Sequence, residues 1–123
     1  MTTEEGNKLI AVFMGIEILN DWDDPDAINK ISATSMLPKQ IKYHSSWSWI
    51  MPVVEKIEGK EIDLNVSVVV KNERCKIYRH KDSDYEQAIT PLVIGENKID
   101  AVYKSVIQFI QWYNEQKTKH ETI

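Results

Sequence analysis

The run EIDLNVSVVVK at residues 61–71 alternates polar and apolar residues for most of its length, which is the repeat of a β-strand with one buried face. Asn72-Glu73 follows, a pair suited to a tight turn. The next run, RCKIYRH at 74–80, places Cys75 and Ile77 on one face. The two runs therefore predict an antiparallel hairpin. The apolar side chains of its first strand are Ile62, Leu64, Val66, Val68 and Val70.

A third apolar run, AITPLVI at 88–94, contains Pro91. Proline has no backbone donor for a sheet, so this run is expected at a sheet edge. The sequence predicts a small antiparallel sheet of about three strands.

Helical spacing of apolar residues recurs in three other segments. Residues 4–14 predict a short first helix that ends near Gly15. The last and longest helix is expected from Asn97, its N-cap, to about Lys117. Together with the sheet, these segments predict an α+β fold, in which three helices pack with a small antiparallel sheet in a single domain over 1–123. Residues 20–42 interrupt this pattern and predict a long surface excursion.

The second predicted helix begins within YHSSWSWIMPVVEKI at 43–57 and ends at Gly59. Pro52 is compatible with a helix near its first turn, which favours Ser48 as the N-cap. Trp49 and Val53 mark a stripe adjoining the main one. The main apolar stripe comprises Trp47, Ile50, Met51, Val54 and Ile57.

The composition narrows the possible classes of protein. The single cysteine excludes an intramolecular disulfide, and the N-terminal residues do not resemble a signal peptide, so a reducing cytoplasm is expected. No apolar run approaches the roughly 20 residues that cross a bilayer. The net charge of −4 argues against general nucleic-acid binding, although a local basic patch can still hold an anion.

Three blocks make up about a third of the chain: NKLIAVFMG at 7–15, YHSSWSWIMPVVEKIE at 43–58 and AVYKSVIQFIQWYNE at 101–115. These blocks resemble a group of small proteins of phages and prophages. The fold is more distantly similar to the helix and sheet arrangement called the phage ABA sandwich. The resemblance implies a phage protein that acts in the host cytoplasm, and it implies no particular activity.

The second hairpin strand lies in a basic segment, KNERCKIYRHK at 71–81, which has five basic residues and one acidic residue. Alternation places Arg74, Lys76 and Tyr78 on the face opposite Cys75. Two cations beside an aromatic ring suit a phosphate and a base. The alternative is a solvated face whose lysines prevent aggregation at a sheet edge.

The start of the second helix offers a second half of such a site. Backbone donors and serine hydroxyls at a helix N-terminus can hold an anion, and aromatic rings can flank a planar ligand. The alternative is structural: a helix cap, a core tryptophan and a tryptophan packed under the long loop. The predicted ligand-binding residues are Tyr43, His44, Ser45, Ser46, Trp47, Trp49, Arg74, Lys76, Tyr78 and Arg79.

The sequence does not predict a metal, a cofactor or a catalytic residue. His44, His80 and His120 lack metal-ligand spacing. The aspartates of NDWDDPD at 20–26 are interrupted by Pro25 and lack the glycine of a calcium loop, which favours a solvated acidic loop.

A homo-oligomer is expected from surplus apolar residues on the helices. Trp49, Phe109 and Trp112 fall outside the main stripes and are expected to face water unless another copy covers them.

These observations favour a non-enzymatic phage accessory protein that binds, and sequesters, a small anionic nucleotide-like signal of the host. This would be an anti-defence protein that serves immune evasion. The alternative is a protein–protein interaction module that inhibits a host enzyme through exposed aromatic residues and the acidic loop. A small phosphodiesterase or nuclease is the third possibility.

Overall fold

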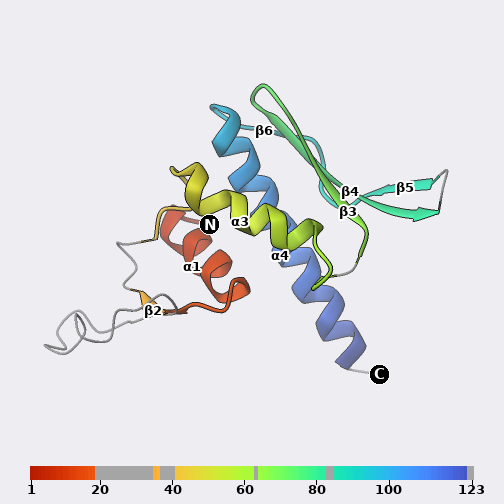
Figure 1. The fold of residues 1–123 in the computed structure, drawn as a ribbon, viewed down its shortest axis with the longest axis horizontal. Coiled ribbons are helices and arrows are strands. Elements are labelled where there is room, and N and C mark those ends of the chain that lie inside the picture. Colours follow the sequence, from red (N-terminus) through yellow and green to blue (C-terminus); the bar gives the residue numbers. More distant parts are fainter. Residues whose placement is uncertain (19–34, 37–40, 63, 83–84, 122–123) are drawn as a thin grey trace, which may run out of the picture.

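The computed structural model describes residues 1–18, 35–36, 41–62, 64–82 and 85–121. Within these residues it shows three helices and a small antiparallel sheet, which confirms the α+β fold (Figure 1). The predicted excursion over 20–42 lies largely outside the described residues. Within it, β2 (Ser35–Met36) pairs in parallel with β1 (Glu17–Ile18).

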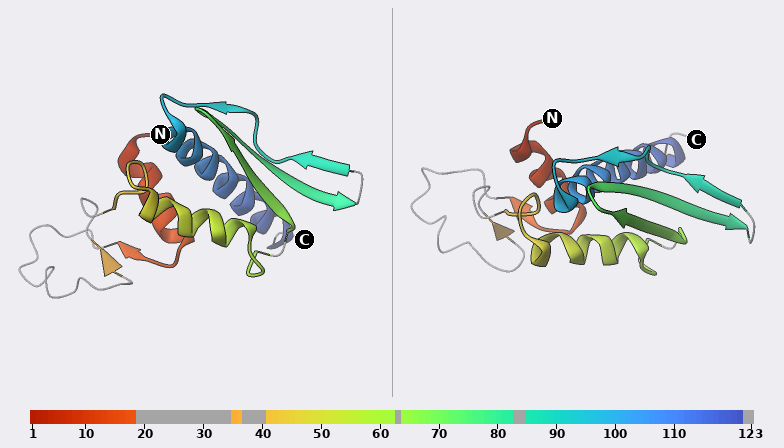
Figure 2. Two further views of the ribbon diagram at one scale, coloured as in Figure 1. Left: turned by 45° about the horizontal axis from the view of Figure 1, so that its top comes forward. Right: turned by 90° about the horizontal axis from the view of Figure 1, so that it is seen from above.

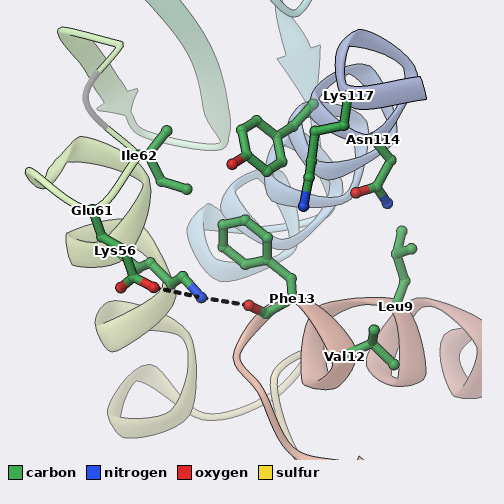
Figure 3. A pocket seen from close by; sticks show the side chains of 9 residues that line it. Leu9, Val12, Phe13, Lys56, Glu61, Ile62, Asn114 and Lys117 are labelled. Atoms are coloured by element: carbon green, nitrogen blue, oxygen red, sulfur yellow. Dashed lines mark hydrogen bonds and ion pairs between the residues drawn. The ribbon is translucent and has the colours of Figure 1, made fainter. Parts of the chain in front are cut away.

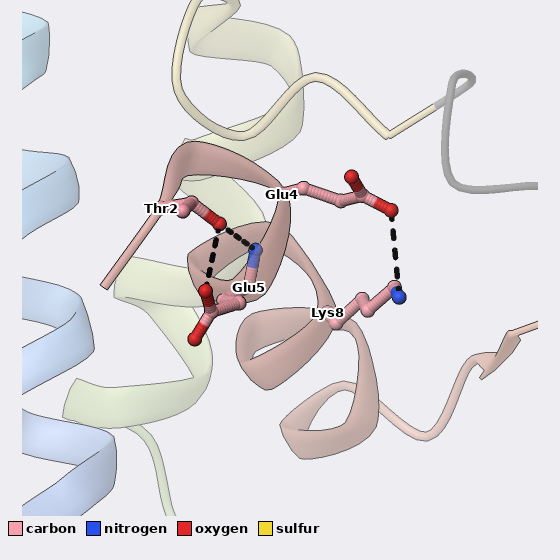
Figure 4. A network of polar contacts seen from close by, with 4 residues as sticks. All are labelled: Thr2, Glu4, Glu5 and Lys8. Carbon is pink, nitrogen blue, oxygen red and sulfur yellow. Dashed lines mark hydrogen bonds and ion pairs between the residues drawn. The ribbon is translucent and has the colours of Figure 1, made fainter.

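The first helix, α1 (Thr3–Phe13), begins after its N-cap Thr2, whose side chain bonds to a residue of the first helical turn. The Thr2 hydroxyl accepts the backbone N–H of Glu5 at 3.2 Å and donates to the Glu5 carboxylate at 3.1 Å (Figure 4). Glu4 and Lys8 pair one turn apart at 3.4 Å. This arrangement is a variant of the capping box, and it confirms the predicted helix.

The second predicted helix, α3 (Trp47–Glu58), begins earlier than expected. Its N-cap is Ser46, whose carbonyl accepts the N–H groups of Trp49 and Ile50, so the prediction of Ser48 as the cap is wrong. Pro52 is consequently the sixth residue of the helix and cannot donate to the Ser48 carbonyl. Both residues are exposed, so water can solvate that carbonyl. Gly59 ends the helix as predicted.

The last helix, α4 (Lys98–Glu121), begins as predicted and is longer than expected. The Asn97 side chain accepts the N–H of Asp100 at 2.9 Å, and the Asp100 carboxylate accepts the N–H of Glu96 at 2.8 Å. Figure 1 shows α4 running past α1, α3 and the sheet. It contacts all of them, and it is therefore the central element of the core.

The hairpin consists of β3 (Val66–Lys71) and β4 (Arg74–Asp82), with Lys71 opposite Arg74 across the predicted turn. Asn72 takes a left-handed conformation, φ 54°, which asparagine tolerates. The first hairpin strand, β3, begins at Val66 and not at Ile62 as predicted, because Asn65 also takes a left-handed conformation, φ 53°. The Asn65 side chain donates to the His80 carbonyl at 3.2 Å.

The run at 88–94 is two short strands rather than one. Both β5 (Tyr85–Ala88) and β6 (Val93–Ile94) pair with β4, so β4 is central and Pro91 lies in the break. Ala88 is opposite Tyr78 and Val93 is opposite Cys75, so residues 89–92 face only two residues of β4. Because the insertion is of two residues, the same face of the sheet continues from β5 to β6.

A threonine compensates for this break. The buried Thr90 hydroxyl accepts the backbone N–H of Ile77 at 3.0 Å, in place of a strand carbonyl. The Ile77 carbonyl accepts the N–H of Ile89 at 2.9 Å. The centre of β4 therefore keeps its hydrogen bonds where the neighbouring strand is irregular.

The core lies between α4, α1, α3 and one face of the sheet. Cys75 and Ile77 are fully buried, and the Ser105 hydroxyl of α4 donates to the Cys75 carbonyl at 3.3 Å. Phe109 is also fully buried, so the expectation that it faces water is wrong. The sheet and the other helices cover α4 from several sides. The buried surface of this helix is therefore wider than a single apolar stripe. Trp49 and Trp112 pack partly buried against the same core.

Figures 1 and 2 show that the ends of β4 and β5 farthest from the β3–β4 turn extend beyond the helices. The β3–β4 turn lies at the other end of the sheet, close to the start of α4. The Gly95 N–H donates to the Glu73 carbonyl at 2.8 Å, and Gly95 approaches the Ala101 backbone so closely that a Cβ would meet it at 2.5 Å. A side chain at this position would therefore push the hairpin away from α4.

Candidate functional site

The strand pairing places several basic residues on the face of the sheet that points away from the core. Directly opposite residues of an antiparallel pair share a face. Lys71 lies opposite Arg74, and Ser67 lies opposite Tyr78, with Lys76 between Arg74 and Tyr78 on β4. We call this surface the basic face, and define it by Lys71, Arg74, Lys76 and Tyr78.

The cations of the basic face are available to a ligand. Lys71 and Arg74 are exposed, and Lys76 is half-buried with its Nζ 5.1 Å from the centre of the Tyr78 ring. None of the three forms an ion pair with another residue in the described ranges. Like charges gathered in one place attract anions, although the net charge of the chain is −4.

Small neighbours leave room beside the Tyr78 ring. Its direct cross-strand neighbours are Ser67 on β3 and Ala88 on β5. Farther along the same face, Val69 is 51% exposed and Ile94 is 61% exposed. The basic face is thus an open surface of cations, one aromatic ring and exposed aliphatic side chains. A planar group can stack on such a surface.

A hydroxyl and an imidazole lie on the same side of the sheet. Ser67 Oγ is 3.0 Å from His80 Nε2. Such a pair can activate a serine when a third group and an oxyanion site support it, and it can equally be a structural cross-strand bond.

Arg79 does not belong to the basic face. It lies opposite the buried Val66 and so points to the same side of the sheet as Ile77. Its grouping with Arg74 and Lys76 as one ligand site is wrong, because adjacent residues of a strand point to opposite faces.

Several polar groups around the start of α3 are occupied by contacts within the protein. The backbone N–H groups of Ser45 and Ser46 donate to the Lys42 carbonyl, at 3.2 and 3.0 Å. The hydroxyls of Ser46 and Ser48 bond to each other at 2.9 Å. These bonds occupy the two N–H groups that precede the helix and the hydroxyls of Ser46 and Ser48, and the anion site expected at this helix start stays a prediction.

His44 also has a structural partner. Its Nδ1 lies 3.0 Å from the side-chain nitrogen of the buried Asn7, which also donates to the Ile41 carbonyl at 3.3 Å. The His44 ring meets the Tyr103 ring edge-on at 6.2 Å. These contacts join the segment before α3 to both α1 and α4.

The aromatic residues around the start of α3 have separate surroundings. Tyr43 is buried, and the half-buried Trp49 packs edge-on against it with ring centres 5.3 Å apart. Trp47 and Met51 are each 42% exposed, so the main apolar stripe is buried only in part, and Trp47 is the more exposed of the two tryptophans. Helix side chains lean toward the N-terminus, and Trp47 as the first residue therefore extends past the helix end. The buried stripe of α3 is Ile50, Val53, Val54 and Ile57.

A shallow groove of about 290 Å³ adjoins Trp49. Its lining is mainly apolar, with Ser48 the only hydroxyl besides that of Tyr43 among the residues that border it. This groove can accept an apolar side chain, but it offers no cation for a phosphate. The residues that line it are Met14, Ile16, Tyr43, Ser48, Trp49 and Pro52.

The two predicted halves of the ligand site do not come together. The Glu58 carboxylate, at the C-terminal end of α3, accepts the Val68 N–H of β3 at 2.9 Å. Trp47 is at the opposite end of this helix, about 16 Å away along its axis. His44 at that end contacts Asn7 of α1, whereas the hairpin turn contacts Gly95 before α4. The basic face is therefore the candidate site on its own.

Sequence reasoning missed Lys71 as a site residue. The signal was present, because a two-residue turn at Asn72-Glu73 places Lys71 opposite Arg74. The exposed Ile94 had no comparable signal, since its register depends on the insertion at 89–92.

Comparisons with known proteins add no family to these observations: no protein-family model, curated protein or solved structure matches the chain. Across the described part of the chain, no helix combines the length and apolar character needed to cross a membrane. The same residues contain no group of three or more histidine, cysteine or acidic side chains placed to bind a metal ion. Burial raises the pKa of the Cys75 thiol, so this side chain is a poor nucleophile.

Proposed function

We propose that this protein is a non-catalytic binding protein that holds a small anionic, nucleotide-like ligand on its basic face. The observation that supports it is the gathering of Lys71, Arg74 and Lys76, without ion-pair partners among the described residues, beside the half-buried ring of Tyr78. In the phage setting that the resemblance implies, we propose an anti-defence role in the host cytoplasm, in which the ligand is an immune signal that the protein sequesters.

The chemistry of the basic face fits a phosphate joined to a planar base. Arginine binds phosphate oxygens through two parallel hydrogen bonds, and lysine acts as a point charge. Lys76 Nζ lies 5.1 Å from the ring centre of Tyr78. A phosphate on Lys76 therefore leaves the attached nucleoside within reach of the ring, where stacking contributes about 1–3 kcal/mol per base.

The first test is isothermal titration with a panel of linear and cyclic nucleotides, using Arg74→Gln, Lys76→Gln and Tyr78→Ala variants. A charge-assisted hydrogen bond contributes about 1.5–3 kcal/mol, so each charge removal is expected to weaken binding about tenfold or more. Lys42→Gln is the matched control, because Lys42 is an exposed cation beside the start of α3. Nucleotide affinities in all four variants equal to that of the parent protein would exclude the basic face as the binding site.

Mass spectrometry of the released ligand separates binding from hydrolysis. Intact ligand supports sequestration. A cleaved product would instead direct attention to Ser67 and His80, whose side chains are 3.0 Å apart. In that case Ser67→Ala is expected to abolish cleavage while ligand binding persists.

A second candidate function is inhibition of a host enzyme by direct contact. It is favoured by the exposed apolar residues Trp47 and Met51, which are neighbours one turn apart on α3. Tryptophan and methionine are enriched in protein interfaces. Absence of nucleotide binding, together with one host protein whose capture is lost in Trp47→Ala, would support this function over the first.

A further inference from the structure

A pocket of about 300 Å³ lies where α1, the end of α3 and the C-terminal half of α4 meet (Figure 3). Leu9 and Val12 of α1 and Ile62 after α3 form its apolar walls. Val12 is 67% exposed, although it lies beside these apolar neighbours. None of the residues that line the pocket belongs to the basic face, so the pocket is independent of the proposed nucleotide site.

One cation of the pocket is held in place by the protein. Lys56 Nζ donates to the Phe13 carbonyl, the last of α1, at 2.6 Å and lies 4.6 Å from the centre of the Phe13 ring. Its side chain is only 19% exposed. A cation beside the last carbonyl of a helix is favourable, and here it also fixes the ammonium at the pocket wall.

The second cation comes from α4. Lys117 Nζ lies 5.5 Å from the centre of the Tyr113 ring, and Figure 3 shows the Lys56 and Lys117 side chains extending from their helices toward Phe13. Lys117 forms no ion pair with another residue in the parts of the chain that the structure describes. An anion between the helices would face both ammonium groups.

The resident counter-ion is weakly placed. Glu61 lies 3.6 Å from Lys56 Nζ, with 74% of its side chain exposed. Exposed ion pairs of this kind contribute about 0–1 kcal/mol. A ligand that carries a carboxylate on an apolar body can therefore displace Glu61 from Lys56. Its apolar body is buried against the walls of the pocket, which contributes a hydrophobic free energy that Glu61 lacks.

We propose that this pocket binds a small carboxylate that has an apolar body and about ten non-hydrogen atoms in total. The size follows from the cavity volume, since one water occupies about 30 Å³ of liquid. The carboxylate lies between Lys56 and Lys117 and competes with Glu61, while the apolar body contacts Leu9, Val12 and Ile62.

The test uses octanoate and 1-octanol, which share a chain and differ in charge. Both are titrated into the protein while the methyl signals of Leu9, Val12 and Ile62 are followed by NMR. Saturable shifts are expected with octanoate, and weaker binding with octanol. A rim charge changes affinity by about two- to fivefold, so Lys117→Gln is expected to weaken octanoate binding by this factor and Glu61→Gln to strengthen it. Neither substitution is expected to change octanol binding.

Lys60→Gln is the control, because Lys60 is an exposed lysine next to Glu61 and does not line the pocket. It is expected to leave the affinity for octanoate unchanged. Octanol that binds as tightly as octanoate would overturn the proposal in favour of a purely apolar cavity. The absence of methyl shifts at millimolar octanoate, or equal octanoate affinity in the Glu61→Gln and Lys117→Gln variants, would overturn it as well.

Discussion

Replacement of Thr90 by valine removes one hydroxyl from the middle of the sheet and leaves the side-chain shape almost unchanged. The hydroxyl accepts the N–H of Ile77 at 3.0 Å, and both residues are at most 2% exposed. Residues 89–92 leave the regular pairing at this point, so no strand carbonyl is opposite this N–H. In the valine variant the Ile77 N–H therefore loses its acceptor in a site that water does not reach.

A buried donor without a partner costs about 1–3 kcal/mol, so we expect the free energy of unfolding to fall by about 2 kcal/mol. The slope of stability against urea is about 1–3 kcal/mol per molar for small proteins, and the unfolding midpoint should fall by about 1 M. Urea denaturation followed by tryptophan fluorescence measures this change. Faster hydrogen exchange at the Ile77 amide should accompany it.

The matched control is Thr90→Ser, which keeps the hydroxyl and loses a methyl group. Loss of one buried methyl costs about 0.8 kcal/mol, and the Ile77 amide should stay protected. A valine variant as stable as the parent protein, or one whose Ile77 amide remains protected, would refute the reasoning.

Three further predictions concern the core. Phe109→Ala removes a fully buried ring and should cost about 3–5 kcal/mol in chemical denaturation, whereas Trp47→Ala, at an exposed site, should cost far less; similar costs would contradict the assigned burial. Burial and the nearby Asp100 raise the pKa of Tyr103 from 10.0 to about 12, so its contribution to stability is fully present below pH 10 and is lost as the pH rises toward 12. The loss is on the order of 2–3 kcal/mol, and Tyr103→Phe should remove it from a stability profile between pH 9 and 12. Cys75 is fully buried, so a thiol reagent should label it at least about 10³-fold more slowly in the native state than in urea, and rapid native labelling would show that the strand opens locally.

Several elements could be predicted from the sequence because their signals are local. The hairpin follows from alternation on both sides of Asn72-Glu73, and the start of α4 follows from Asn97 and Asp100. The same alternation predicted that Arg74, Lys76 and Tyr78 share a face. These features depend on residues close together in the chain, whose geometry the backbone repeat determines.

Other features depended on which elements meet. Phe109 lies outside the main apolar stripe of α4, yet it is fully buried because the sheet and the other helices cover this helix from different sides. The homo-oligomer was predicted because Trp49, Phe109 and Trp112 were expected to face water. For Phe109 this reason no longer holds. Trp47 and Trp49 are equally apolar in the sequence, and only the packing of Trp49 against Tyr43 distinguishes them.

The candidate sites show the same division. The sequence determined that cations alternate along one strand, because strand periodicity alone decides which side chains share a face. Tertiary structure decided that this face stands apart from the start of α3, and that Lys56 and Lys117 meet at one pocket although they are far apart in the chain. Contacts between residues far apart in the chain result from the packing of whole helices and sheets, and the spacing of residues along the sequence does not predict them.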